Sequence, residues 1–248
     1  MGGRAVGRTM SFYDLRDALA QPGCAVCRLK ANSVEQFLDT LLWERVNDSG
    51  TRRDIRQARG FCREHAWKLV RPGASLGVAI IMQDVLQNVL RLMANASFQA
   101  LPSLSLQRLH GALASEQPTS ATADLVARLA PQAMCPACKQ AKTMERIYLD
   151  TLLDALLRED GLLAAYESSD GLCLPHLCQA LAQVRDRAVF EALLNAQRAI
   201  WERLAADLGE FIRKNDYRFR DEPLGEEGDA WLRAIAALAG SRPERGES

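Results

Sequence analysis

The sequence predicts an all-α protein built from two tandem, pseudo-equivalent helical repeats, each with a Cys3His metal site, packed as one bundle-like domain. Three observations lead to this prediction. Apolar residues recur at spacings of three and four, which is typical of helices with one buried face. No segment shows the signals of a strand. The motifs CxxC and CxxH each occur twice, in the same order along the 248 residues.

The two motif sets match without a gap. The differences 135 − 24, 138 − 27, 173 − 62 and 176 − 65 between corresponding Cys and His positions all equal 111, and the same offset carries LDTLL at 38–42 onto LDTLL at 149–153. We therefore divide the chain into an N-terminal segment (1–23), repeat 1 (24–98), a connector with short helices (99–134), repeat 2 (135–209) and a C-terminal docking segment with a tail (210–248).

Each repeat is predicted to contain four helices in the same order. A long helix begins at CxxC and ends at a turn, NDSG at 47–50 or EDG at 159–161. A short helix leads to Gly60 or Gly171, where we expect the chain to reverse, and a third helix begins at CxxH. The fourth and longest is expected over 77–96 in repeat 1 and 186–214 in repeat 2. The apolar stripe of the first long helix consists of Val34, Phe37, Leu38, Leu41, Leu42 and Val46, and in repeat 2 of Leu149, Leu152, Leu153, Leu156 and Leu157.

The Cys and His residues predict two metal sites. CxxC places two thiolates on one tight turn, and CxxH places a thiolate and an imidazole on one side of a helix, because residues three apart differ by about 300° around the axis. Both motifs lie at expected helix N-termini, where unpaired N–H groups stabilise thiolate charge. We expect the hairpin within each repeat to join its two half-sites, so that the chain binds two Zn²⁺. The ligands would be Cys24, Cys27, Cys62 and His65 in repeat 1 and Cys135, Cys138, Cys173 and His176 in repeat 2.

Other interpretations of these cysteines stay open at this point. Thiolates also hold iron–sulfur clusters, and one His per set does not exclude them. A thiol redox pair is less favoured, because its CxxC would be expected near a βαβ pattern. Cys178, five residues after Cys173, points away from the ligand face and is expected in the core.

Asp39 and Asp150 recur in both repeats but lie about 18 Å along the helix from the CxxC motifs, so we expect capping, salt bridges or contacts between repeats for them. His110 is expected on a helix surface.

In the C-terminal segment, Arg218, Arg220, Glu222 and Glu227 could form a ligand or partner surface. The favoured alternative is that Trp231 and the last helix dock on the bundle while the charges pair at its rim, with a frayed tail after residue 240.

Composition and motifs narrow the range of functions that this sequence could have. Thirty-one basic and 31 acidic residues give no net charge, so neither nucleic acid nor a membrane surface is expected as a partner. The N-terminus lacks a secretion signal, which indicates a cytoplasmic protein. A closed Cys3His site has no position for substrate, and the sequence contains no phosphate loop, GxSxG motif or recognisable nucleophile and base. We expect a non-enzymatic scaffold that binds another protein. The alternatives are an iron–sulfur redox or sensing protein and, less favoured, an enzyme with its site between the repeats.

The motifs also resemble those of a known family. CAVC with GFCREH, CPAC with GLCLPH, and the later NDYRFRDEP and GDAW look like an uncharacterised bacterial family classified only as a domain of unknown function. The resemblance covers Cys24 to Gly240 and includes all eight Cys and His positions. It implies a helical fold and a prokaryotic origin, and it carries no activity with it.

Overall fold

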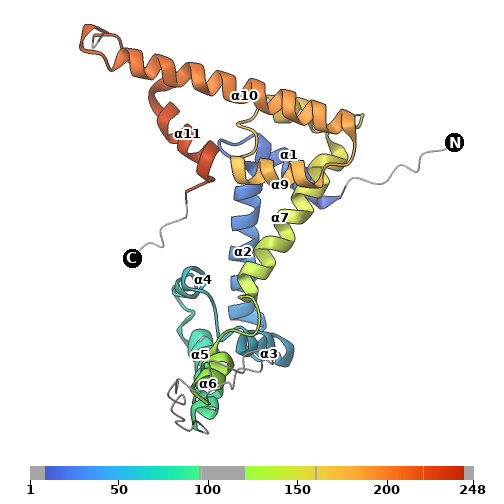
Figure 1. Ribbon diagram of the computed structural model, residues 1–248, viewed down its shortest axis with the longest axis vertical. Helices are drawn as coiled ribbons and strands as arrows, with labels where there is room; N and C mark the ends of the chain where they lie inside the picture. The colour runs from blue at the N-terminus through green and yellow to red at the C-terminus, as the bar shows by residue number, and fades with distance from the viewer. Residues whose placement is uncertain (1–8, 95, 97–120, 160, 220, 243–248) are drawn as a thin grey trace, which may run out of the picture. The chain divides into compact units, whose positions relative to one another are not determined.

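The computed structural model describes residues 9–94, 96, 121–159, 161–219 and 221–242 (Figure 1). These residues form helices and turns, and no strand occurs among them, so the all-α prediction is confirmed. The helices are α1 (Met10–Leu19), α2 (Ala25–Glu44), α3 (Ser49–Gln57), α4 (Arg63–Trp67), α5 (Ser75–Ala94), α6 (Ala121–Leu129), α7 (Pro136–Ala155), α8 (Leu163–Glu167), α9 (Leu174–Gln183), α10 (Arg187–Lys214) and α11 (Ala230–Ala239), with short 3₁₀ turns η2 (Tyr217–Phe219) and η3 (Glu226–Asp229).

Local sequence signals explain where several helices begin. The carboxylate of Asp48 accepts a hydrogen bond from the Thr51 N–H at the start of α3, and Asp186 caps α10 in the same way. Proline is the first residue of α7 and the second of α9, in the first turn, where its missing N–H costs nothing. The helices predicted at 77–96 and 186–214 are present as α5 and α10.

The chain folds into two compact units that do not coincide with the predicted repeats. Unit 1 comprises residues 1–35 and 140–248, and unit 2 comprises residues 36–139. Helix α2 therefore begins in unit 1 and ends in unit 2, and α7 runs from unit 2 into unit 1. The division into repeats 24–98 and 135–209 remains a prediction from the sequence.

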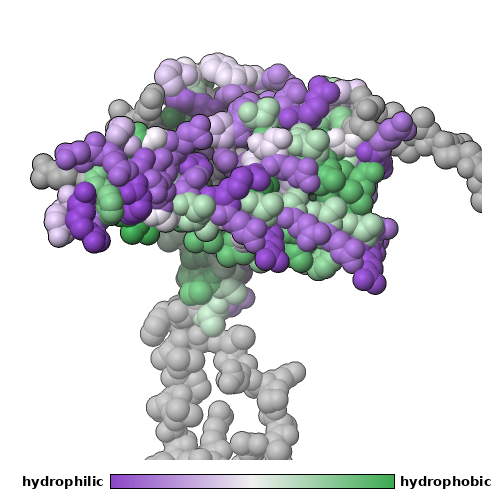
Figure 2. All heavy atoms as spheres, turned by 90° about the horizontal axis from the view of Figure 1, so that it is seen from above, coloured by the Kyte–Doolittle hydropathy of each residue, from purple (hydrophilic) through white to green (hydrophobic). Residues whose placement is uncertain are grey.

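Unit 1 has an extended apolar core. Helix α1 packs against α8, α8 packs against the long helix α10, and α11 packs against both α9 and α10. The side chains that are at most 1 % exposed include Leu15, Leu149, Leu152, Leu156, Leu162, Tyr166 and Leu172. Hydrophilic residues cover much of the surface seen in Figure 2, with patches of hydrophobic residues between them.

Unit 2 has a smaller core around α3 and α5. Helix α5 packs against α3 and α6. The buried apolar side chains include Leu38, Leu41, Ile55, Leu69, Ile81 and Val85. Helix α6 lies in the predicted connector, so one of its expected short helices is present; His110 and most of the connector lie outside the described residues.

Candidate metal centre

The structure brings all eight predicted ligands into two groups of four. The Cys24 cluster consists of Cys24, Cys27, Cys173 and His176 in unit 1, and the Cys135 cluster consists of Cys62, His65, Cys135 and Cys138 in unit 2. Within each cluster, the four ligand atoms all lie within 4.8 Å of one another. Either cluster could hold a metal ion.

The expected pairing of the half-sites is wrong. Each cluster joins the CxxC of one repeat to the CxxH of the other, whereas we expected each repeat to complete its own set. The eight residues are the same under both arrangements, which is why the sequence motifs alone do not distinguish them.

Helix lengths explain the crossed pairing. A 20-residue helix such as α2 is about 30 Å long, whereas the nine-residue α3 that follows spans only about 13 Å. The chain therefore does not return Cys62 to Cys24. Instead, the segment after α4 stays beside the C-terminal half of α2, where Arg71 bonds to Asp39.

The antiparallel course of α2 and α7 supplies the other half-site. In unit 1 the Lys30 ammonium donates to Glu145 at 3.1 Å, and the Gln140 amide donates to Ser33 at 2.9 Å. Residue numbers rise along one helix as they fall along the other. In unit 1, the CxxC at the start of α2 meets the CxxH that follows α7, and in unit 2 the CxxC at the start of α7 meets the CxxH that follows α2.

The Cys24 cluster is arranged around one imidazole nitrogen. Nδ1 of His176 lies 3.3 Å from Sγ of Cys24, 3.4 Å from Sγ of Cys27 and 3.2 Å from Sγ of Cys173. The sulfur atoms of Cys27 and Cys173 are 3.7 Å apart. All but Cys27 are buried, and Cys27 is half-buried.

The Cys135 cluster repeats this geometry. Nδ1 of His65 lies 3.2 Å from Sγ of Cys62, 3.7 Å from Sγ of Cys135 and 3.3 Å from Sγ of Cys138, and the sulfur atoms of Cys62 and Cys138 are 3.6 Å apart. His65 and Cys135 are buried, and the other two ligands are half-buried.

Four of the cysteines are held at helix N-termini. Cys62 and Cys173 are the N-cap residues of α4 and α9, and Cys24 and Cys135 directly precede α2 and α7. Gly60 and Gly171, which lead into the CxxH turns, have φ of 96° and 69°, a backbone conformation that side-chain-bearing residues rarely adopt. The expected chain reversal at these two glycines is confirmed.

Thiols and imidazole interact strongly in the Cys24 cluster. Hydrogen bonds with Cys173 and with Cys24 hold the pKa of Cys27 far below its ordinary value, whereas the hydrogen bond to Cys173 raises the pKa of Cys24. Burial alone would lower the pKa of His176, but its bonds to the sulfur atoms of Cys173 and Cys27 raise it to about 10. One thiolate is thus favoured and further ionisation is opposed, and a bound cation would remove that opposition.

In the Cys135 cluster, burial is the main effect on Cys138. It raises the pKa of this thiol to about 12, and the neighbouring Cys62 adds to the shift. A metal ion would have to displace this proton, so metal affinity in this cluster should fall as the pH is lowered.

Comparison with known proteins places the chain in a family. A family model described as "Family of unknown function (DUF6062)" matches residues 9–245. The chain belongs to this family. The resemblance drawn from the motifs is therefore confirmed. A relative in Caldicellulosiruptor sp. (strain Rt8B.4), named "Uncharacterized 23.9 kDa protein in xynA 3'region", is 26 % identical over 220 residues, which cover 88 % of this chain and 96 % of the relative. No solved structure gives a significant match.

Two further features support the Cys24 cluster, and the sequence did not indicate either. Nε2 of His176 lies 2.7 Å from a carboxylate oxygen of Glu145, which also accepts from Lys30. Ligating histidines commonly bond to a carboxylate through the second ring nitrogen, which fixes the ring and its tautomer. The offset of 111 places Val34 opposite Glu145, so comparing the repeats does not single out this carboxylate.

The second feature is the backbone after α11. A Cβ atom on Gly240 would lie 3.5 Å from Sγ of Cys27 and 3.9 Å from Sγ of Cys173, and the Ser241 N–H donates to Cys27. Gly240 has φ of 92°. The end of the C-terminal segment thus lies against the sulfur atoms of Cys27 and Cys173.

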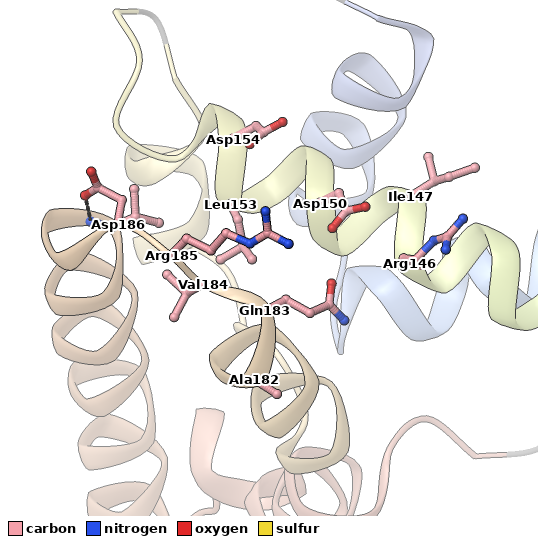
Figure 3. Close-up of a pocket in the computed structure, with 11 residues that line it drawn as sticks. Arg146, Ile147, Asp150, Leu153, Asp154, Ala182, Gln183, Val184, Arg185 and Asp186 are labelled. Atoms are coloured by element: carbon pink, nitrogen blue, oxygen red, sulfur yellow. Dashed lines mark hydrogen bonds between the residues drawn. The ribbon is translucent and has the colours of Figure 1, made fainter.

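A separate groove of about 880 Å³ lies in unit 1 between α7 and the turn from α9 to α10. Figure 3 shows Arg185 and Gln183 reaching from that turn toward α7, which contributes Arg146 and Asp150. No Ser, Cys or His lines this groove, so its described lining lacks a nucleophile paired with a base.

Asp39, Asp150 and Cys178 all lie outside the two clusters. Asp39 forms the predicted kind of salt bridge, with Arg71. The core prediction for Cys178 is wrong, because this side chain is exposed. Helical phasing correctly turned it away from Cys173, but the far side of α9 faces solvent there.

The C-terminal segment docks on unit 1 through its last helix, but the expected docking of Trp231 is wrong, because this side chain is 48 % exposed. Helix α11 packs against α9 and α10, and Glu222 and Glu227 form ion pairs with Arg213 and Lys214 of α10. Arg218 pairs with Asp216, and Arg220 lies outside the described residues.

Proposed function

We propose that the protein is a non-enzymatic scaffold that binds one Zn²⁺ in each cluster and presents its helical surface to another protein. One observation carries the proposal: two complete sets of three sulfur atoms and one imidazole nitrogen converge, each set within 4.8 Å. Three thiolates with one histidine is a common ligand set of structural zinc.

The spacing of the ligands favours a single ion over an iron–sulfur cluster. Sulfur atoms about 2.3 Å from a tetrahedral zinc ion are about 3.8 Å apart. The two measured sulfur pairs, Cys27 with Cys173 and Cys62 with Cys138, are 3.7 and 3.6 Å apart. A cluster with several iron atoms distributes its ligands over different irons and would need them farther apart.

The proposed role of the metal is structural. Four protein ligands complete the coordination of zinc and leave no position for water or substrate. Each cluster also joins segments that are far apart in the sequence, so the free energy of metal binding would contribute directly to folding. Free thiols in this number suit a reducing compartment, which supports a cytoplasmic location. The balanced charge favours a protein partner over nucleic acid.

Metal analysis combined with unfolding tests this proposal. Protein purified without oxygen should contain two zinc ions per chain and no visible absorbance. Removing them with a strong chelator should lower the melting temperature and, at the same time, reduce the helical circular dichroism signal in part. Adding zinc back should restore both. An apoprotein with the same helicity and melting temperature would refute the structural role. Iron with visible absorbance would favour the redox or sensing alternative.

A further inference from the structure

Helix α5 carries a stripe of exposed residues with coiled-coil spacing. The α5 stripe consists of Leu76, Ala79, Gln83, Leu86, Leu90 and Met93, all exposed. The exposed fraction is 72 % for Leu76, 61 % for both Leu86 and Leu90, and 50 % for Met93. The positions alternate between spacings of three and four, which is the a/d pattern of a helix that packs along another helix.

The opposite side of α5 already anchors it in unit 2. Asp84 forms ion pairs with Arg56 at 2.7 Å and Arg52 at 3.4 Å, and Asn88 accepts a hydrogen bond from Arg59 at 3.3 Å. Ile81 and Val85 are buried. These contacts fix the rotation of α5, so the stripe is directed away from α3.

Helix α5 is also long and apolar enough to cross a membrane by length and composition, and 11 % of its most apolar window is buried. Charged residues inside a membrane are costly and rare. Asp84, bonded to two arginines of α3 in the middle of α5, therefore favours a helix of a folded unit over one surrounded by lipid.

The corresponding face in repeat 2 is covered by helices. The offset of 111 places Leu86, Leu90 and Met93 opposite Gln197, Trp201 and Leu204 of α10. Gln197 is 1 % exposed and bonds to Tyr166 of α8. Trp201 packs against the unit 1 core, and Leu204 lines a groove together with Leu232 and Ala236 of α11. In the described part of unit 2, no helix covers the α5 stripe in this way.

We propose that a second copy of this chain covers the α5 stripe, with α5 packed against α5 in a dimer. The heptad spacing calls for a helix as the occupant. The stripe contains no charged residue, so two identical copies meet without like-charge repulsion. A two-fold axis brings the same residues together from both copies, so each apolar stripe would be buried against the identical stripe of the other copy.

The available area is sufficient for a specific interface. Trp43 is 65 % exposed, and its ring lies close to Gly73, two residues before α5. Trp43 with the three leucines and Met93 of the stripe would bury on the order of 500 Å² per copy, or about 1,000 Å² in total. This is the lower limit for a specific interface, so we expect a dimer that dissociates on dilution.

Sedimentation of the metal-loaded full chain tests the proposal. The wild type should sediment as a dimer at micromolar concentrations. The double variant Leu86→Glu with Leu90→Glu should be monomeric, with a dissociation constant raised about 100-fold or more, because four carboxylates would be buried in the seam. Gln87→Glu, which adds one negative charge on α5 beside the stripe, should remain dimeric.

Circular dichroism and metal content should be the same in all three proteins, which separates lost dimerisation from misfolding. A monomeric wild type would overturn the proposal, whether or not it binds phosphatidylcholine vesicles. A double variant that remains dimeric would also overturn it, because the interface would then lie elsewhere.

Discussion

Replacing Glu145 with alanine should weaken zinc binding at the Cys24 cluster alone. The Glu145 side chain is 14 % exposed and lies 2.7 Å from Nε2 of His176 and 3.1 Å from Nζ of Lys30. Burial opposes its ionisation, but hydrogen bonds from His176 and Lys30 hold its pKa below the ordinary value, so it is a carboxylate at neutral pH. Its removal would free the imidazole to rotate and leave the Lys30 cation beside it.

The expected loss is 10- to 100-fold in zinc affinity, as is typical when such a partner of a ligating histidine is removed, or about 1.4 to 2.7 kcal/mol. Glu145→Gln keeps an acceptor of the same shape and should lose less. A chromophoric chelator that competes for zinc would resolve the two sites, and the Cys135 cluster serves as the internal reference. Asp154→Ala, an exposed acid on the same helix, is the matched control. Equal weakening at both clusters, or no weakening at either, would refute the reasoning.

Three further predictions concern residues around the clusters and the C-terminal segment. Cys178→Ala should leave the metal content unchanged and alter the free energy of unfolding by less than about 0.5 kcal/mol in denaturant titrations, because the side chain is exposed; loss of one zinc would contradict this. Gly240→Ala should lower stability by about 1–2 kcal/mol in thermal unfolding, because φ of 92° disfavours alanine; an unchanged transition would argue against the backbone turn over Cys27. Hydrogen bonds from the Gly225 N–H and Lys214 hold the pKa of Glu227 at about 2, below its value in the unfolded chain, so this carboxylate stabilises the fold above an unfolded pKa of about 4.3. The melting temperature of Glu227→Gln should therefore fall below that of the wild type at neutral pH, and the difference should shrink as the pH falls from about 4 toward 2; a difference independent of pH would exclude this origin.

The sequence was sufficient to predict the helices and the eight Cys and His residues that form the two clusters, because both depend on local spacing. Apolar stripes and caps such as Asp186 act within a few residues, and CxxC and CxxH indicate half-sites without knowledge of the fold. Which CxxC pairs with which CxxH depends on tertiary geometry, because the helices that follow α2 and α7 are too short to lead the chain back along them.

The sequence does not indicate Glu145, because the bond to a cluster histidine exists in one repeat only. It does not indicate Gly240, because this residue lies outside both repeats.

The periodicity of a single helix shows only toward which side of that helix a side chain points. It correctly predicts that Cys178 points away from the side of α9 that carries Cys173. It does not say whether the protein core or solvent lies on that other side.

Zinc content in two matched double variants tests the central claim most directly, because the crossed and the within-repeat pairings predict opposite results. Cys24→Ser with Cys173→Ser removes two ligands from the Cys24 cluster only, so the protein should retain one zinc per chain. Cys24→Ser with Cys62→Ser damages both clusters, so it should retain none. Elemental analysis after dialysis against a weak chelator gives both values. No zinc in the first variant and one zinc in the second would contradict the crossed arrangement.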